Sequence, residues 1–98
     1  MFLRVNRYKI CKKDLSKWKS NNDAANQIYR ECGAERLERI IRRNGDGIEV
    51  MELGYYKSRG EFERIVARVD KDERIDELFR EFKKMVTEEV TNEEYETI

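Results

Sequence analysis

Apolar and polar residues alternate along four short stretches of this chain. Alternation with a period of two is typical of strands, because successive side chains point to opposite faces of a sheet. The pattern predicts strands over residues 2–10, 36–43, 48–56 and part of 87–98. The second and third of these flank the block Asn44-Gly45-Asp46-Gly47, whose residues favour a tight hairpin turn.

A different spacing follows the first strand: from Leu15 onward, apolar residues recur at three- and four-residue steps. This is the spacing of one face of an amphipathic helix. Asp14 is expected to cap its first turn, and Gly33 stands where a glycine commonly ends a helix. The polar run Ser20 to Asp23 has low helix propensity, so a later start near Asp23 is the alternative.

A second helical region follows the third strand. Ser58 and Glu61 form the capping box that opens many helices, with the serine before the first turn and the glutamate three residues later. The same spacing recurs between Asp70 and Glu73. We therefore predict a kink or a restart of the helix at Asp70.

The order strand, helix, hairpin, helix, strand predicts a single α+β domain over residues 1–98. It is the βαββαβ arrangement of the ferredoxin-like fold, an antiparallel sheet with strand order 4-1-3-2 and two helical segments on one face. Apolar residues nevertheless occur on both faces of the first strand, with Phe2 and Tyr8 on one and Leu3 and Val5 on the other. The uncovered face needs a second layer, most simply another copy of the chain, so we expect a homodimer.

Charge is balanced overall, with 21 basic and 21 acidic residues, but it is unevenly distributed. Residues 1–19 contain seven bases and one acid, and residues 87–98 contain five glutamates and no base. We interpret this as cross-strand pairing between neighbouring first and last strands. A basic patch for a phosphate-bearing partner is the alternative. A net charge of zero argues against a general nucleic-acid binder.

Several kinds of chemistry lack the residues they need. The chain has no histidine, which removes histidine-ligated metals and Ser-His or Cys-His nucleophile pairs. Cys11 and Cys32 bracket the first helix, about 30 Å apart at 1.5 Å per residue, too far for a disulfide. No metal or other cofactor is expected. The cysteines and the lack of a signal or spanning segment indicate a cytoplasmic protein without membrane association.

One constellation has the composition of a small-molecule pocket. Arg4, Asn6 and Tyr8 alternate along the first strand and therefore share a face with apolar residues. Aromatic residues that could wall such a pocket are Trp18, Tyr29 and Tyr55. In the alternative interpretation, cross-strand or dimer contacts satisfy the polar groups and the aromatics belong to the core.

The stretch Glu49 to Tyr56, followed by Ser58 to Glu63, resembles the dimeric α+β barrel superfamily of antibiotic-biosynthesis monooxygenase-like, NIPSNAP-like and EthD-like domains. There, a strand is often followed by a Ser-x-x-Glu-Phe helix start and an acidic restart such as Asp70 to Asp72. The resemblance implies a homodimer whose sheets meet as a barrel, with a pocket between each sheet and its helices or at the seam. The missing histidine argues against the branch that ligates haem through histidine.

The resemblance leaves several functions open. Some relatives oxidise quinol-like or polyphenolic substrates with O2 and without metal or flavin, whereas others have no known activity. The first hypothesis is thus a cofactor-independent, monooxygenase-like enzyme for an aromatic or polyketide-like molecule, in which Arg4 stabilises an oxyanion, Asn6 or Tyr8 orients it and Trp18 stacks on the ring. The second is a non-catalytic binding or assembly module. The third, least favoured, is a single-stranded nucleic-acid binder.

Overall fold

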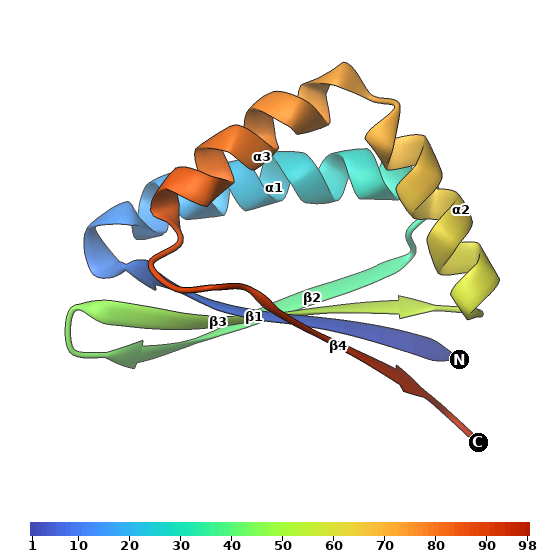
Figure 1. The fold of residues 1–98 in the computed structure, drawn as a ribbon, viewed down its shortest axis with the longest axis horizontal. Helices are drawn as coiled ribbons and strands as arrows, with labels where there is room; N and C mark the ends of the chain where they lie inside the picture. The colour runs from blue at the N-terminus through green and yellow to red at the C-terminus, as the bar shows by residue number, and fades with distance from the viewer.

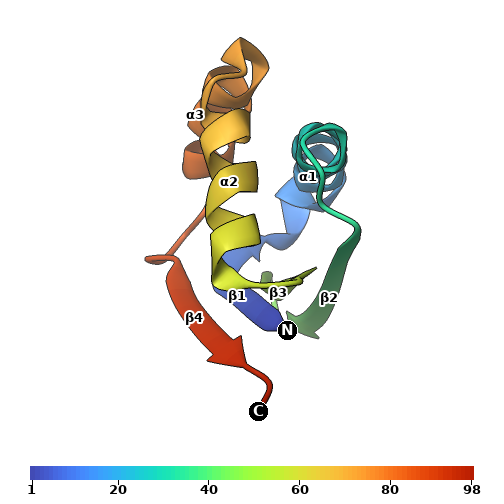
Figure 2. The ribbon, with the colours of Figure 1, turned by 90° about the vertical axis from the view of Figure 1, so that its right-hand side faces the viewer.

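A computed structural model describes all 98 residues and contains the predicted order of elements (Figure 1). The elements in chain order are β1 (Phe2–Cys11), the short 3-10 turn η1 (Lys12–Asp14), α1 (Leu15–Glu31), β2 (Arg36–Asn44), β3 (Gly47–Tyr56), α2 (Arg59–Asp70), α3 (Glu73–Met85) and β4 (Thr91–Glu96). The strands form one antiparallel sheet in the order β2-β3-β1-β4, as predicted. All helices lie on one face of it, and the other face is open (Figures 1 and 2). This is a ferredoxin-like α+β fold.

The hairpin between β2 and β3 fixes the register of half the sheet. Asn44 pairs with Gly47, so the loop has two residues, and Gly45 has a φ of 62°. Glycine in the first loop position with positive φ suits a turn that matches the twist of the strands. Gly54 lies within β3 at a place of close approach: strand pairing continues through it, and a Cβ there would lie 2.8 Å from the Tyr56 hydroxyl.

The ends of α1 agree only in part with the sequence prediction. The helix begins at Leu15, and the later start near Asp23 is wrong. Asp14 makes no capping hydrogen bond, because it belongs to η1 and its backbone (φ −94°, ψ 1°) is not extended as a capping residue requires. Gly33, just after the helix, has a φ of 117° and ends it as predicted.

The second helical region restarts, as the two capping boxes indicated. Ser58 caps α2, its Oγ accepting a hydrogen bond of 3.1 Å from the Glu61 amide. The second cap differs from the prediction: Asp72, not Asp70, accepts from the amide of Arg74 at 3.0 Å. Asp70 is instead the last residue of α2, and the residue that caps α3 lies two positions later.

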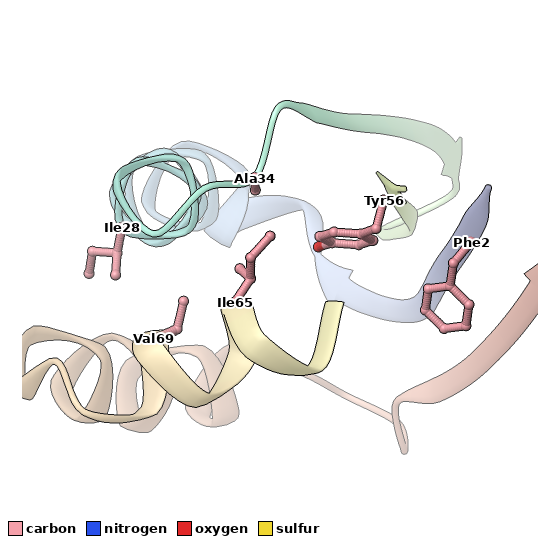
Figure 3. Close-up of a cluster of buried hydrophobic side chains, with 6 residues drawn as sticks. All are labelled: Phe2, Ile28, Ala34, Tyr56, Ile65 and Val69. Atoms are coloured by element: carbon pink, nitrogen blue, oxygen red, sulfur yellow. The ribbon is translucent and has the colours of Figure 1, made fainter. Parts of the chain in front are cut away.

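The core consists of two apolar clusters at opposite ends of the strands. Figure 3 shows the first, in which α1 and α2 pack on the sheet; its buried members are Phe2, Ile28, Ala34, Tyr56, Ile65 and Val69. The second contains Tyr8, Ile10, Trp18, Ile48, Val50 and Met85. The middle of the sheet, between the clusters, carries polar side chains toward the helices.

The ends of the chain pair as their charges predicted. β1 and β4 are neighbours, and three ion pairs join β1 to β4 and the segment before it: Arg4–Glu94 at 3.0 Å, Arg7–Glu93 at 2.5 Å and Lys9–Glu88 at 3.3 Å. The two cysteines are unpaired. None of the helices has the length and apolarity needed to span a membrane.

Candidate functional site

A row of polar side chains crosses the sheet at the level between the two apolar clusters. Strand register places Asn6 of β1 beside Asn92 of β4 on one side and beside Glu52 of β3 on the other, and Glu52 beside Arg39 of β2. All four belong to the face that the helices cover, because they alternate with residues of the open face. We call Asn92, Asn6, Glu52 and Arg39 the polar row.

Hydrogen bonds tie this row to buried aromatic side chains. The Tyr8 hydroxyl donates to Glu52 Oε2 at 2.5 Å, and the indole Nε1–H of Trp18 donates to the Tyr8 oxygen at 2.7 Å. Arg39 donates to Asn22 Oδ1 of α1 at 2.7 Å. The Glu52 carboxylate is therefore held in one orientation by a chain of donors that starts in the core.

The electrostatic setting of Glu52 differs from that of a surface glutamate. Burial raises the pKa of its carboxyl, although hydrogen bonds from Tyr8 and Asn22 and the charge of Arg39 act in the opposite direction. Burial and then the neighbouring Glu52 charge raise the pKa of Tyr8 far above its usual range, so this phenol keeps its proton and remains the donor. A carboxylate with a raised pKa is a better proton acceptor at neutral pH than an ordinary one.

Above the row lies a cavity of about 700 Å³, in the size range of sites for small molecules. The polar row and Tyr8 contribute Asn6, Tyr8, Glu52 and Asn92 to its floor. Helix α3 supplies an apolar wall of Ile75, Leu78, Phe79 and Phe82. The cavity thus combines a large apolar surface with a few fixed polar groups, as ligand sites commonly do.

A smaller cavity of about 140 Å³ adjoins the large one, and five residues line both. The shared residues are Asn6, Asn22, Ala25, Tyr29 and Glu52. Arg4 lines only the smaller cavity, where it faces Glu94 at 3.0 Å and donates weakly to Asn6 at 3.4 Å. Glu52 therefore lines both cavities.

Of the six residues predicted to form a pocket, four line these cavities. Asn6, Tyr8 and Tyr29 line the larger one, and Arg4 the smaller one. Trp18 is buried behind Tyr8 and lines neither, so it is not placed to stack on a ligand in them.

Tyr55 is the second departure from the predicted pocket. It pairs with Leu3 and Arg36, alternates with Tyr56 and lies on the open face of the sheet. It was grouped with the pocket for its aromatic character, and strand alternation excludes it.

The sequence analysis missed Glu52, which is the central charged group of the site. A signal for it was present, since Glu52 interrupts the alternation of Ile48, Val50 and Tyr56 with a carboxylate on a face meant for the core. The two-residue turn also sets Glu52 opposite Arg39. No group of three carboxylate or thiol side chains is placed to hold a metal ion.

Comparison with known proteins places this arrangement in a structural context. No family model matches the chain, and no curated protein sequence matches it. A NIPSNAP-family protein of unknown function from Agrobacterium tumefaciens superposes with a TM-score of 0.79 at 14% identity, covering 97% of this chain and 86% of that one. An antibiotic biosynthesis monooxygenase superposes at 0.76 with 8% identity, covering 100% and 99%.

The cofactor-independent oxygenase SnoaB from Streptomyces nogalater, in a mutant form, superposes with a TM-score of 0.70 at 11% identity, covering 98% of this chain and 91% of that one. At identities this low, a superposition shows a likeness of fold alone. The three superpositions agree with the strand order and with the helical layer on one face of the sheet. The chain therefore has the ferredoxin-like α+β fold, which it shares with an antibiotic biosynthesis monooxygenase, a cofactor-independent oxygenase and a NIPSNAP-family protein.

Proposed function

We propose that the large cavity binds a small, mostly apolar molecule and that Glu52 removes a proton from it. The observation that carries this proposal is the Tyr8–Glu52 hydrogen bond on the floor of a 700 Å³ cavity. Tyr8 fixes the Oε2 atom of the carboxylate on the cavity side of the sheet. A general base must lie within hydrogen-bonding reach of the proton that it takes, and Glu52 lines the cavity wall.

An aromatic or polyketide-like molecule with an acidic O–H or C–H suits this site. Its rings would pack on the aromatic wall of α3, and its acidic group would face Glu52. Loss of the proton makes a phenol or enol electron-rich, the form that reacts more readily with O2. One structural neighbour, SnoaB, is a cofactor-independent oxygenase, and this likeness supports a monooxygenase-like reaction of this kind.

The test is oxygen uptake in the presence of anthrone, a tricyclic ketone with an acidic C–H. We expect the protein to accelerate uptake above the rate without protein. Glu52→Gln should lose at least about a hundredfold of that acceleration, the size of a general-base contribution, while still binding anthrone. Glu63→Gln, an exposed glutamate on α2, is the matched control and should keep full activity. Equal rates for wild type and Glu52→Gln would refute the role of Glu52.

A non-catalytic binding module is the second candidate, and one observation favours it. The Tyr8 hydrogen bond stabilises the charged carboxylate and so opposes proton uptake. In that case, anthrone or a related ligand binds to the wild type and to Glu52→Gln alike, and no oxygen is consumed by either. The same two measurements, binding and uptake, therefore separate the two functions.

We also propose that the open face of the sheet is covered by a second copy of the chain. Apolar side chains gather on it, and Ile40 and Tyr95 remain 57% and 49% exposed in the single chain. The other members are Leu3, Val5, Met51, Leu53 and Tyr55. A sheet face with this many apolar side chains favours a protein partner over water, and the fold is shared with a superfamily of dimers.

A further inference from the structure

Charge around the large cavity is unbalanced, although the chain as a whole is neutral. Four carboxylates line the cavity, Glu52, Asp70, Asp76 and Glu88, against a single basic residue, Lys83. Lys9 neutralises Glu88 at 3.3 Å, but Asp70 and Asp76 form no ion pair. A concave site with apolar walls concentrates such a field more than a flat surface does.

Asp70 is unusual because it occupies an unfavourable place for a carboxylate. It is the last residue of α2, where the helix dipole is negative and a basic side chain would be stabilising. Asp72, two residues away, is neutralised by Arg74 at 2.7 Å, whereas Asp70 has no such partner. The corner between α2 and α3 therefore presents an uncompensated negative charge to the cavity.

This negative charge reaches the interior of the cavity. Burial raises the pKa of the Tyr29 phenol, and the charges of Asp70 and then Glu52 raise it further. Four aromatic residues line the same space, Tyr8, Tyr29, Phe79 and Phe82, and the Lys83 ammonium lies 4.6 Å from the centre of the Phe79 ring. Aromatic faces together with carboxylates form the usual environment for an organic cation.

We infer that the aromatic molecule bound in the large cavity also carries an amine, whose ammonium group lies near the corner of Asp70 and Asp76 while the apolar body packs on α3. This inference rests on the proposed function, since it assigns a ligand class to the same cavity. It predicts selection by charge: an ammonium is attracted, a neutral analogue binds by its apolar body alone, and a carboxylate is repelled.

The test compares three ligands with one body, phenylbutylamine, phenylbutanol and phenylbutyrate, by titration calorimetry on the wild-type protein. We expect the amine to bind about tenfold more tightly than the alcohol, and the acid more weakly than the alcohol. The advantage of the amine should shrink when salt rises from about 0.1 M to about 1 M, because exposed charges are then screened.

Variants of the charged residues that line the cavity test whether these charges cause the preference for the amine. The double variant Asp70→Asn with Asp76→Asn should bring the affinities of amine and alcohol within about twofold of each other, and Lys83→Gln should widen the gap. The matched control, Glu35→Gln with Glu63→Gln, removes the same charge at exposed positions outside the cavity and should leave the order unchanged.

The outcomes separate this inference from the proposed function. Binding of the alcohol with equal or tighter binding of the acid overturns the selection for amines and leaves the cavity as a ligand site. If none of the three ligands binds, both the ligand class and the ligand site are refuted. Retention of the amine preference in the Asp70/Asp76 double variant would show that these two carboxylates do not cause it.

Discussion

At the residue scale, the hydroxyl of Tyr8 serves two partners at once. It accepts from the indole of Trp18 and donates to Glu52, and both aromatic side chains are almost fully buried. A single oxygen atom thus connects the packing of the second apolar cluster to the orientation of the carboxylate in the cavity. Loss of that oxygen should therefore affect both the packing around Trp18 and the orientation of the Glu52 carboxylate.

Tyr8→Phe removes this oxygen and leaves the indole N–H of Trp18 without an acceptor in the core. We expect the free energy of unfolding to fall by about 1–3 kcal/mol, the cost of an unsatisfied buried donor. Urea denaturation followed by fluorescence of Trp18, the only tryptophan, measures it. Tyr29→Phe is the control: its hydroxyl has no hydrogen-bond partner within the chain, so the change should stay within about 0.5 kcal/mol. Equal losses of stability in Tyr8→Phe and Tyr29→Phe would show that the hydrogen bonds of Tyr8 do not stabilise the fold.

Glu52 should make stability depend on pH in a direction opposite to that of most surface carboxylates. Burial raises its pKa in the folded chain above the ordinary value near 4.5. Between the two values the folded state holds the proton that the unfolded chain has released, so stability falls as pH rises through this window. Below the ordinary value the contribution is fully present.

Glu52→Gln removes this dependence, and comparison with the wild type isolates it. We expect the variant to gain stability relative to the wild type as pH rises above about 4.5, and to keep a constant advantage above the folded pKa. Thermal unfolding over a series of buffers measures the difference. A wild type that gains stability relative to Glu52→Gln across that range would show that hydrogen bonding outweighs burial.

At the scale of elements, the break between α2 and α3 depends on one capping aspartate. Asp72→Ala removes the oxygen that accepts from the Arg74 amide and should lower the midpoint temperature of unfolding. Asp70→Asn should leave the midpoint unchanged or raise it, because a negative charge at the end of α2 is unfavourable. Calorimetry on both variants measures the two midpoint temperatures. A lower midpoint for Asp70→Asn than for Asp72→Ala would show that Asp70 is the cap.

Elements were easier to predict than the site, for a physical reason. Periodicity, the two-residue turn and the charges of the ends determine strands, register and neighbours, and these agree with the structure. The site depends on which face each side chain shares with distant residues. Tyr55 was misplaced and Glu52 missed because neither aromatic character nor charge, taken alone, indicates a face. The predicted cap at Asp14 was wrong because the short turn η1 gives this residue a non-extended backbone, and the one at Asp70 was wrong because the spacing to Glu73 does not show where α2 ends.

At the scale of the whole molecule, the open face decides the state of assembly. In light scattering coupled to size-exclusion chromatography, we expect a mass near twice 11.9 kDa. Ile40→Lys, at the exposed centre of β2, should give the monomer mass without unfolding the chain, because this side chain contacts little within one copy. Ile98→Lys alters an even more exposed residue beyond β4 and should remain dimeric. A monomeric wild type would refute the proposal that a second copy of the chain covers the open face of the sheet.

The two ends of the chain meet at one corner of the sheet. Figure 1 shows the N- and C-termini at the same end of the sheet. The terminal amine of Met1 donates to Thr97 Oγ1 at 2.9 Å, and the Thr97 amide donates to the Met1 carbonyl at 3.0 Å. In terms of connectivity, the 98 residues almost close into a ring. A short linker from Ile98 to Met1, with a new opening between Gly45 and Asp46 at the hairpin tip, would give a circular permutant that keeps every strand pairing.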